Sequence, residues 1–154
     1  MTVDDLPALM VLQEQGAVAG LSHIFPQDRY PFPVDQVCDR WRAELADPTT
    51  VPFVSTDAAG VLTGFSAIRS DVLLHFGTAL ETWGSGLAQE LHDATVDALR
   101  GSQPNAESCF LHVFEQNCRA RRFYEKLGWT PTGTSKPTQY PPNPILLEYR
   151  LTLV

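Results

Sequence analysis

Residues 111–129 read LHVFEQNCRARRFYEKLGW, an apolar strand pattern that runs directly into an amphipathic helix pattern. Asn117 suits the N-cap of that helix, because its side-chain oxygen can accept a hydrogen bond from a first-turn N–H. Gly128 is a typical C-terminal stop. The helical spacing predicts one buried stripe, made of Ala120, Phe123, Tyr124 and Leu127. Packing alone does not explain why a tyrosine hydroxyl lies on that stripe.

A second informative segment lies upstream, where residues 76–88 read FGTALETWGSGLA. Two glycines directly before a helix free backbone N–H groups to converge, and the helix N-terminus adds partial positive charge, so an anion such as a pyrophosphate can bind there. The segment is not a dinucleotide fingerprint, since Gln89 replaces the third glycine, and no Gly-Lys-Ser/Thr follows as in a P-loop. Gly77, inside the preceding strand pattern, predicts a β-bulge.

The remaining periodicity gives helices and strands in mixed order. Helices are predicted over residues 4–19, 34–46, 86–100 and 117–127. Strands are predicted over residues 51–55, 61–68, 71–78, 108–114, 129–132 and 145–153, the first two as a hairpin. This order predicts an α/β (α+β) fold with a mixed sheet of about six to seven strands and helices on both faces.

Length, composition and charge narrow the class of protein. The 154 residues suit a single domain, and 44% hydrophobic residues with 19% charged ones suit a packed chain. Eleven Lys and Arg against eighteen Asp and Glu give a net charge of −7, which disfavours binding to nucleic acid or to an anionic membrane surface. The chain opens without the features of a secretion signal. Its three cysteines, Cys38, Cys109 and Cys118, lack metal-ligand spacing and are expected to be buried or half-buried thiols. A cytoplasmic protein without a metal is therefore predicted.

Together the two segments resemble the GCN5-related N-acetyltransferases (GNAT), a family that transfers an acetyl group from acetyl-CoA to an amine. Its cofactor motif, roughly Arg/Gln-x-x-Gly-x-Gly/Ala, is matched at its end by residues 86–88. Its second motif, Asn-x-x-Ala-x-x-x-Tyr-x-x-x-Gly-Phe, is matched by Asn117, Ala120, Tyr124, Gly128 and Trp129. The resemblance implies an acyl-CoA N-acyltransferase-like fold with a partly splayed sheet. One domain would span residues 1–154, with a helical acceptor-side part at 1–47 and a cofactor-binding core at 48–154.

The resemblance also implies a site for acetyl-CoA, the co-substrate, between the strands at 71–79 and 108–114. Its expected contacts are Phe76, Gly77, Thr78, Trp83, Gly84, Ser85, Gly86, Leu87, Ala88, Asn117 and Tyr124. A backbone N–H near Thr78 would stabilise the oxyanion, and Tyr124 would donate a proton to the leaving CoA thiolate. The basic cluster at 119–126 is either a patch for the CoA 3′-phosphate or the solvated face of a helix.

Three departures from the family pattern stand out. Trp83 and Ser85 occupy positions where basic or amide side chains are frequent, and the usual first strand is nearly absent. The positions at which relatives carry a Glu or His base correspond to the apolar Val72 and Leu74, so no residue is assigned as general base. Water or a histidine could take the amine proton. His75 has the wrong strand parity for this role unless a bulge shifts it.

The acceptor is expected beside the N-terminal helices. His23, Arg29, Tyr30 and His75 are predicted as its contacts, and Asp28, Gln139 and Tyr140 are expected nearby. His92 is predicted to be exposed in the middle of a helix.

The predicted function is N-acetyl transfer to a primary amine of a small molecule or peptide, by direct attack, in a monomer or homodimer. The acidic chain favours a cationic acceptor. The alternatives are a non-catalytic domain of the same fold that binds an acyl-CoA or a partner, and an acyltransferase with a longer acyl donor.

Overall fold

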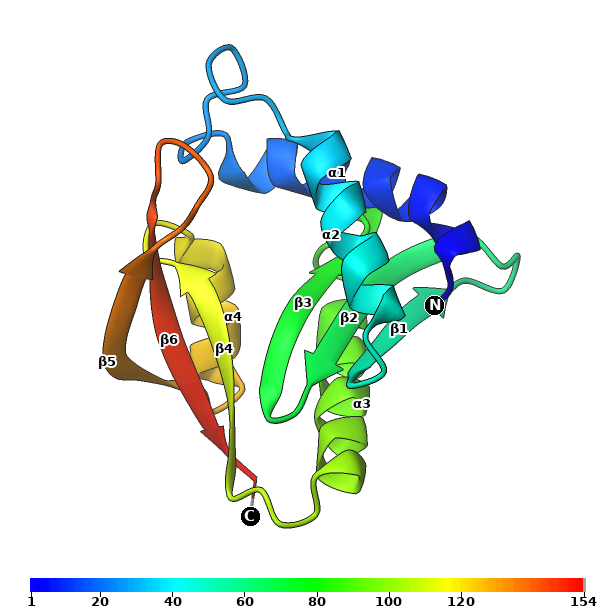
Figure 1. Cartoon of the computed structure of the whole chain (residues 1–154), viewed down its shortest axis with the longest axis vertical. Coiled ribbons are helices and arrows are strands. Elements are labelled where there is room, and N and C mark those ends of the chain that lie inside the picture. Colours follow the sequence, from blue (N-terminus) through cyan, green and yellow to red (C-terminus); the bar gives the residue numbers. More distant parts are fainter. Residues whose placement is uncertain (154) are drawn as a thin grey trace.

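A six-stranded mixed sheet runs through the computed structural model, which describes residues 1–153 (Figure 1). Its strand order is β1-β2-β3-β4-β6-β5. The strands are β1 (Thr50–Thr56), β2 (Leu62–Arg69), β3 (Val72–Thr78), β4 (Ser108–Phe114), β5 (Thr130–Pro137) and β6 (Ile145–Thr152). Every predicted strand is confirmed, although β5 continues beyond the predicted residue 132. No strand precedes the first helix in the part of the chain that the structure describes.

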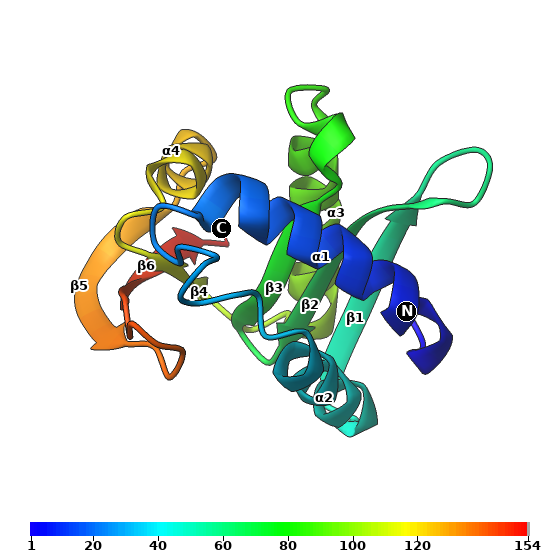
Figure 2. The same ribbon diagram turned by 90° about the horizontal axis from the view of Figure 1, so that it is seen from above.

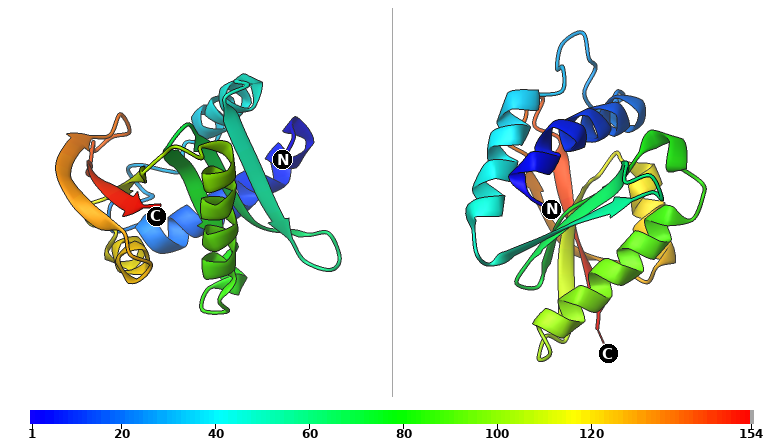
Figure 3. Two further views of the ribbon diagram at one scale, coloured as in Figure 1. Left: turned by 90° about the horizontal axis from the view of Figure 1, so that it is seen from below. Right: turned by 90° about the vertical axis from the view of Figure 1, so that its right-hand side faces the viewer.

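The helices cover both faces of the sheet, as predicted. They are α1 (Leu6–Leu21), α2 (Val34–Ala46), α3 (Leu87–Ser102) and α4 (Cys118–Lys126), with short 3₁₀ turns at Val3–Asp5 and Leu80–Thr82. Figures 2 and 3 show α1 and α2 on one face and α3 and α4 on the other. One apolar core lies under α1 and α2 around Leu9 and Trp41, and a second lies under α3 and α4 around Leu99 and Trp129.

The sheet opens between its two parallel neighbours, β3 and β4. Only Val72 with Phe110 and Leu73 with Leu111 pair across these strands within the described residues. The strands then diverge toward the end at which α1 and the loop after it lie, and the sheet takes a V shape (Figure 1). The predicted splay is therefore confirmed, and it leaves backbone groups of both strands without a partner strand.

The β-bulge of β3 lies at Leu74 and not at Gly77, so the predicted position is wrong. The register with β2 shifts between the pairs His75–Ala67 and Leu73–Ile68. Gly77 is needed for a different reason, because a Cβ there would lie 2.6 Å from the ring of Phe65. A bulge changes which face the following side chains occupy.

Two further predictions about side-chain burial are corrected. His92 is buried, because the helix α3 turns it into the second core, where its Nε2 accepts a hydrogen bond from Trp129 Nε1 at 2.9 Å. Cys118, expected to be at least half-buried, is exposed at the first residue of α4.

Candidate active site

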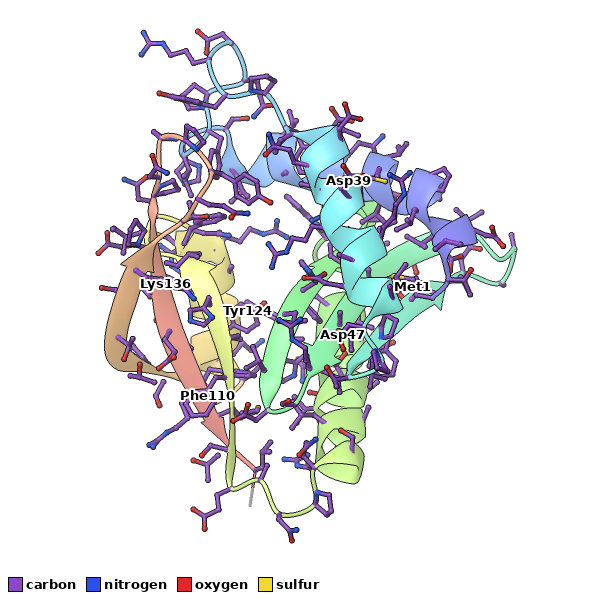
Figure 4. All side chains as sticks on the ribbon, in the orientation of Figure 1. Met1, Asp39, Asp47, Phe110, Tyr124 and Lys136 are labelled. Atoms are coloured by element: carbon purple, nitrogen blue, oxygen red, sulfur yellow. The ribbon has the colours of Figure 1, made fainter. Side chains whose placement is uncertain are left out.

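A cavity of about 600 Å³ fills the open end of the sheet. Its walls come from α1, the loop between α1 and α2, α2, β3, the end of β4, α4 and the loop before β6. Figure 4 shows Tyr124 between β4 and β3, at the point where the two halves of the sheet separate. Segments from the whole length of the chain therefore meet at this one cavity.

The edge of β3 offers free backbone groups to this cavity. Ala79 N donates to Thr63 O at 2.8 Å, so these two residues form a hydrogen-bonded pair with β2. Along an antiparallel pair of strands, hydrogen-bonded residue pairs alternate with pairs that are not hydrogen-bonded. Gly77 and Phe65 therefore form the next hydrogen-bonded pair. The N–H and C=O groups of Phe76 and Thr78, on either side of Gly77, point away from β2. They point toward the gap, because β4 has already diverged. This arrangement suits an extended chain of amides, and the Thr78 N–H can face a carbonyl oxygen.

The turn before α3 has the geometry of an anion cradle. Gly84 and Gly86 have φ values of +84° and +95°, in the left-handed region that favours glycine. A Cβ built on either glycine meets nothing within 4 Å, so the space above the turn is open. Gly86 is the N-cap of α3, and the first-turn N–H groups of a helix have no intrahelical partners. The backbone can therefore hold a phosphate without side-chain help.

Arg119 of α4 supplies the positive charge that this turn lacks. Its guanidinium lies 3.3 Å from the ring centre of Trp83, as a cation–π contact. The same indole donates from Nε1 to Thr78 O at 3.2 Å, and its far edge lies 3.4 Å from a Cβ built on Gly20 of α1. Trp83 thus joins α1, β3 and α4 and carries an arginine at the mouth of the cavity. By contrast, Arg121 bonds Tyr149 and Glu115 and has a structural role.

Tyr124 forms part of the cavity wall on the α4 side. Phe76 of β3 packs against Phe123 and Tyr124, with ring centres 5.8 and 6.3 Å away. Burial raises the pKa of Tyr124, so the phenol keeps its proton. Within residues 1–153, Thr50 Oγ1 is the one fully enclosed side-chain polar atom without a partner. The Tyr124 hydroxyl makes no hydrogen bond to a described residue and is not fully enclosed, and the Tyr124 side chain lines the cavity.

His75 forms part of the opposite wall and bonds a carboxylate. Its Nε2 lies 2.5 Å from Glu44 Oε2, and its ring packs at a tilt against Trp41 of α2, with ring centres 4.3 Å apart. The bulge explains this direction: Leu74 and His75 both face α1 and α2, whereas Leu73 and Phe76 face α3 and α4. The bulge therefore places the His75 side chain on the face of the sheet that strand alternation alone did not predict for it.

The charge states of this pair follow from their surroundings. Burial lowers the pKa of His75 below its ordinary value, and Glu44 offsets this only in part. Burial alone would raise the pKa of Glu44, but the bonds from His75 and Arg40 leave it below its ordinary value. A neutral imidazole therefore donates from Nε2 to an ionised carboxylate. Nδ1 is then an acceptor; it makes no hydrogen bond to a described residue and is not fully enclosed, and His75 lines the cavity.

The structure places the predicted cofactor contacts at the gap. Those that line the cavity are Phe76, Gly77, Thr78, Trp83, Ala88, Asn117 and Tyr124. Gly84, Ser85, Gly86 and Leu87 form the adjoining turn and the start of α3. Asn117 Oδ1 accepts from Ala120 N at 3.2 Å, which confirms it as the N-cap of α4.

The structure separates the predicted acceptor residues into two groups. Tyr30, His75 and Tyr140 line the cavity. His23, Asp28, Arg29 and Gln139 lie outside the lining and are exposed. The His23 ring instead bonds Gln116 O at 2.9 Å, which ties the loop after α1 to the turn after β4.

Sequence reasoning missed Glu44 and Arg40. Both lie on the amphipathic helix α2, where a charged side chain at the edge of an apolar stripe is ordinary. One feature of the sequence could have pointed to Glu44. It lies three residues after Trp41 and next to Leu45, on the apolar face of the helix, where a side chain is expected to be buried. A buried glutamate needs a partner, but the sequence did not say which residue provides it.

Metal and membrane sites do not emerge from the described residues. Across residues 1–153, no three His, Cys, Asp or Glu side chains gather closely enough to hold a metal ion. None of the helices in that range combines the length and the apolar character needed to cross a bilayer.

Comparison with known proteins places these features in a family. The model of the acetyltransferase (GNAT) family matches residues 18–129. A search of curated proteins found no significant match.

Several solved structures share the fold. The ribosomal-protein-S18-alanine N-acetyltransferase of Escherichia coli superposes with a TM-score of 0.72 at 20% identity, over 99% of this chain and 90% of that one. A spermidine N-acetyltransferase of Vibrio cholerae in complex with CoA and spermine gives 0.71 at 18% identity, over 99% and 92%. The PaiA N-acetyltransferase of Thermoplasma acidophilum in complex with coenzyme A gives 0.72 at 15% identity, over 96% and 94%.

Proposed function

The chain belongs to the acetyltransferase (GNAT) family, and from this premise we propose that it acetylates a primary amine by direct attack on acetyl-CoA, with His75 as general base and Tyr124 as general acid. Membership makes the chain an N-acetyltransferase with acetyl-CoA as co-substrate. The acid–base assignment rests on one observation. His75, bonded to Glu44, and Tyr124 line one cavity from the two sides of a sheet whose strands have separated between them.

Acetyl-CoA fits the residues that are present. The outward backbone groups of Phe76 and Thr78 can pair with the amides of its pantetheine arm. The turn at 84–86 offers N–H groups to the pyrophosphate, and Arg119 offers charge to the phosphates. Trp83 Nε1 donates to Thr78 O in this structure, so the indole lies where the arm would run and would have to release that carbonyl for it.

A residue of this chain can then assist each chemical step. Nδ1 of His75 accepts the proton of the amine as its nitrogen attacks the thioester carbon. The Thr78 N–H stabilises the oxyanion that forms. As the C–S bond breaks, Tyr124 donates its proton to the sulfur, and the products are an N-acetyl amine and free CoA. Solvent restores the proton of Tyr124 and takes the one from His75.

The alternative of a non-catalytic domain arose because the sequence lacked an obvious base and carries Trp83 where a basic or amide side chain is frequent. The His75–Glu44 pair offers a base, and Arg119 over Trp83 offers a positive charge. A neutral histidine held in one tautomer by a carboxylate is a suitable base near neutral pH.

The function can be tested by release of free CoA thiol from acetyl-CoA in the presence of a panel of primary amines. The panel should contain amino acids, arylalkylamines, polyamines and short peptides. Amine-dependent release, with the N-acetyl product identified by mass spectrometry, supports the proposal. Binding of acetyl-CoA without release for any amine would contradict it and favour the non-catalytic alternative.

A further inference from the structure

The charges on the cavity wall have the opposite sign to the chain as a whole. The chain carries a net charge of −7. Yet the lining contains two arginines, Arg40 and Arg119, and no aspartate or glutamate. Arg119 lies over Trp83 beside the cradle for phosphates. Arg40 is the cation that remains at the other end, next to the reacting groups.

Arg40 is bonded to Glu44 through one guanidinium nitrogen, and its other two nitrogens are available to a ligand. Its Nε donates to Glu44 Oε1 at 3.0 Å, while its two terminal nitrogens make no hydrogen bond to any residue in the range 1–153. Its side chain is 43% exposed and lines the cavity. The guanidinium fork is thus free to bind a carboxylate from the cavity side.

Arg40 and His75 are held side by side by the same carboxylate. Glu44 Oε1 accepts from Arg40, and Oε2 accepts from His75. These two bonds keep Nε of Arg40 and Nε2 of His75 less than about 8 Å apart. A molecule whose amine lies at Nδ1 of His75 can therefore reach the terminal nitrogens of Arg40 with a group that it carries a few bonds away. Glu44 is buried and does not line the cavity, so its carboxylate is not presented to a second positive charge there.

The rest of this end of the cavity is apolar and aromatic. Leu21 and Val37 contribute aliphatic surface, and the larger part comes from the loop after α1 and the loop before β6, namely Phe25, Tyr30, Pro31, Phe32, Pro33, Tyr140 and Pro141. Such a wall stabilises an aliphatic or aromatic body by burial. The polar groups that remain here, Gln13, Gln27 and Gln36, are uncharged.

We propose that the acceptor is an amine that carries its own carboxylate and an apolar or aromatic body, an amino-acid-like molecule whose carboxylate binds Arg40 while its amine lies at His75. This inference rests on the proposed function and names its substrate class. Arg40 also favours the reaction, since a nearby cation favours the neutral, nucleophilic form of the amine. A polyamine, by contrast, brings a second positive charge to a wall with an arginine and no free carboxylate. The charge of the cavity thus argues against the cationic acceptor that the overall composition suggested.

A matched pair of acceptors tests the carboxylate contact. L-Phenylalanine and L-phenylalaninamide share the amine and the ring, and only the first carries a carboxylate. We expect kcat/KM to be higher for the acid, although the amide has the less basic amine. In Arg40→Gln, KM for the acid should rise ~10–100-fold, as for the loss of a hydrogen bond between charged groups. KM for the amide should change little. Arg42→Gln, on the exposed face of the same helix, is the control.

The outcomes separate this inference from the function on which it rests. Acetylation of spermidine or phenylalaninamide in preference to the acid, or an equal loss for acid and amide in Arg40→Gln, overturns the carboxylate contact and leaves the transferase intact. Calorimetric binding of the acid in the presence of CoA gives a second measurement. Binding that depends on Arg40 without any acetyl transfer supports the carboxylate contact and contradicts the proposed function. No binding and no transfer overturn both.

Discussion

Nε2 of His75 lies 2.5 Å from Oε2 of Glu44, although the two residues are 31 positions apart and belong to a strand and a helix. The bond holds α2 against the open end of the sheet and selects one imidazole tautomer. The carboxylate that selects the tautomer also holds Arg40. One glutamate thus orients both the group that accepts a proton and the group that we propose to bind the acceptor.

His75→Gln should remove the general base while keeping a polar side chain on β3. We expect kcat to fall by ~10²–10⁴-fold, because no other described side chain on that wall can accept the proton. Affinity for acetyl-CoA, measured by calorimetry, should stay the same. His112→Gln changes an exposed histidine on β4 and is the control. An unchanged kcat in His75→Gln would show that water accepts the proton.

Glu44→Gln should change the pH profile as well as the rate. Burial holds the pKa of His75 below its ordinary 6.5, so the base is free at neutral pH and kcat/KM falls only as the pH drops through that lowered pKa. The charge of Glu44 raises this pKa, so its removal should move the acid limb to lower pH and lower the plateau. Asp39→Asn, an exposed carboxylate of α2, should leave the profile unchanged. An acid limb at the same pH in Glu44→Gln would disprove the coupling.

Tyr124→Phe removes one hydroxyl and keeps the ring that packs on Phe76 and Trp129. We expect turnover to fall by roughly 10–100-fold with acetyl-CoA affinity nearly unchanged. The loss should be smaller at high pH, where the thiolate needs less help in leaving. Tyr149→Phe, whose hydroxyl bonds Arg121 and Glu125 and lies outside the cavity, is the matched control. Full activity in Tyr124→Phe would remove the phenol from the mechanism.

Gly86→Asp should abolish the stabilisation by acetyl-CoA. At a hundred times the Kd, a ligand adds about 2.7 kcal/mol, which is roughly 5–10 °C in Tm for a chain of this size. A carboxylate at position 86 would enter the open space above the turn and repel the pyrophosphate. Gly60→Asp is a close control, because Gly60 has a φ of +82°, equally open space and a place at the tip of the β1–β2 hairpin. It should keep the full shift in a thermal melt.

Arg119→Ala should weaken acetyl-CoA binding by about tenfold, because one charged partner of a phosphate is lost. The variant should also show a shallower dependence of log Kd on log salt concentration. Arg122→Ala, an exposed neighbour outside the cavity lining, should change neither quantity. Equal effects of the two variants on calorimetric Kd would mean that the contact is general attraction to α4.

The sequence by itself determined the order and type of the elements. Hydrophobic periodicity is a local property, so every helix and strand could be predicted, with most ends within about two residues and β5 as the exception. The glycines at positions 84 and 86 likewise predicted the anion cradle, and the Asn117–Trp129 motif predicted the cap and the end of α4. Both predictions were possible because helix caps and left-handed turns need particular residue types.

Only the tertiary structure decided which side chains meet. The strand-register shift at Leu74 turns His75 toward α2, whereas strand parity admitted His75 as a base only if a bulge shifted it, and the bulge was predicted at Gly77. Glu44 and Arg40 gain their roles only when α2 packs against β3. The physical reason is that a bulge and a helix–sheet contact are set by packing between segments far apart in the chain, whereas periodicity records only neighbours within a few turns.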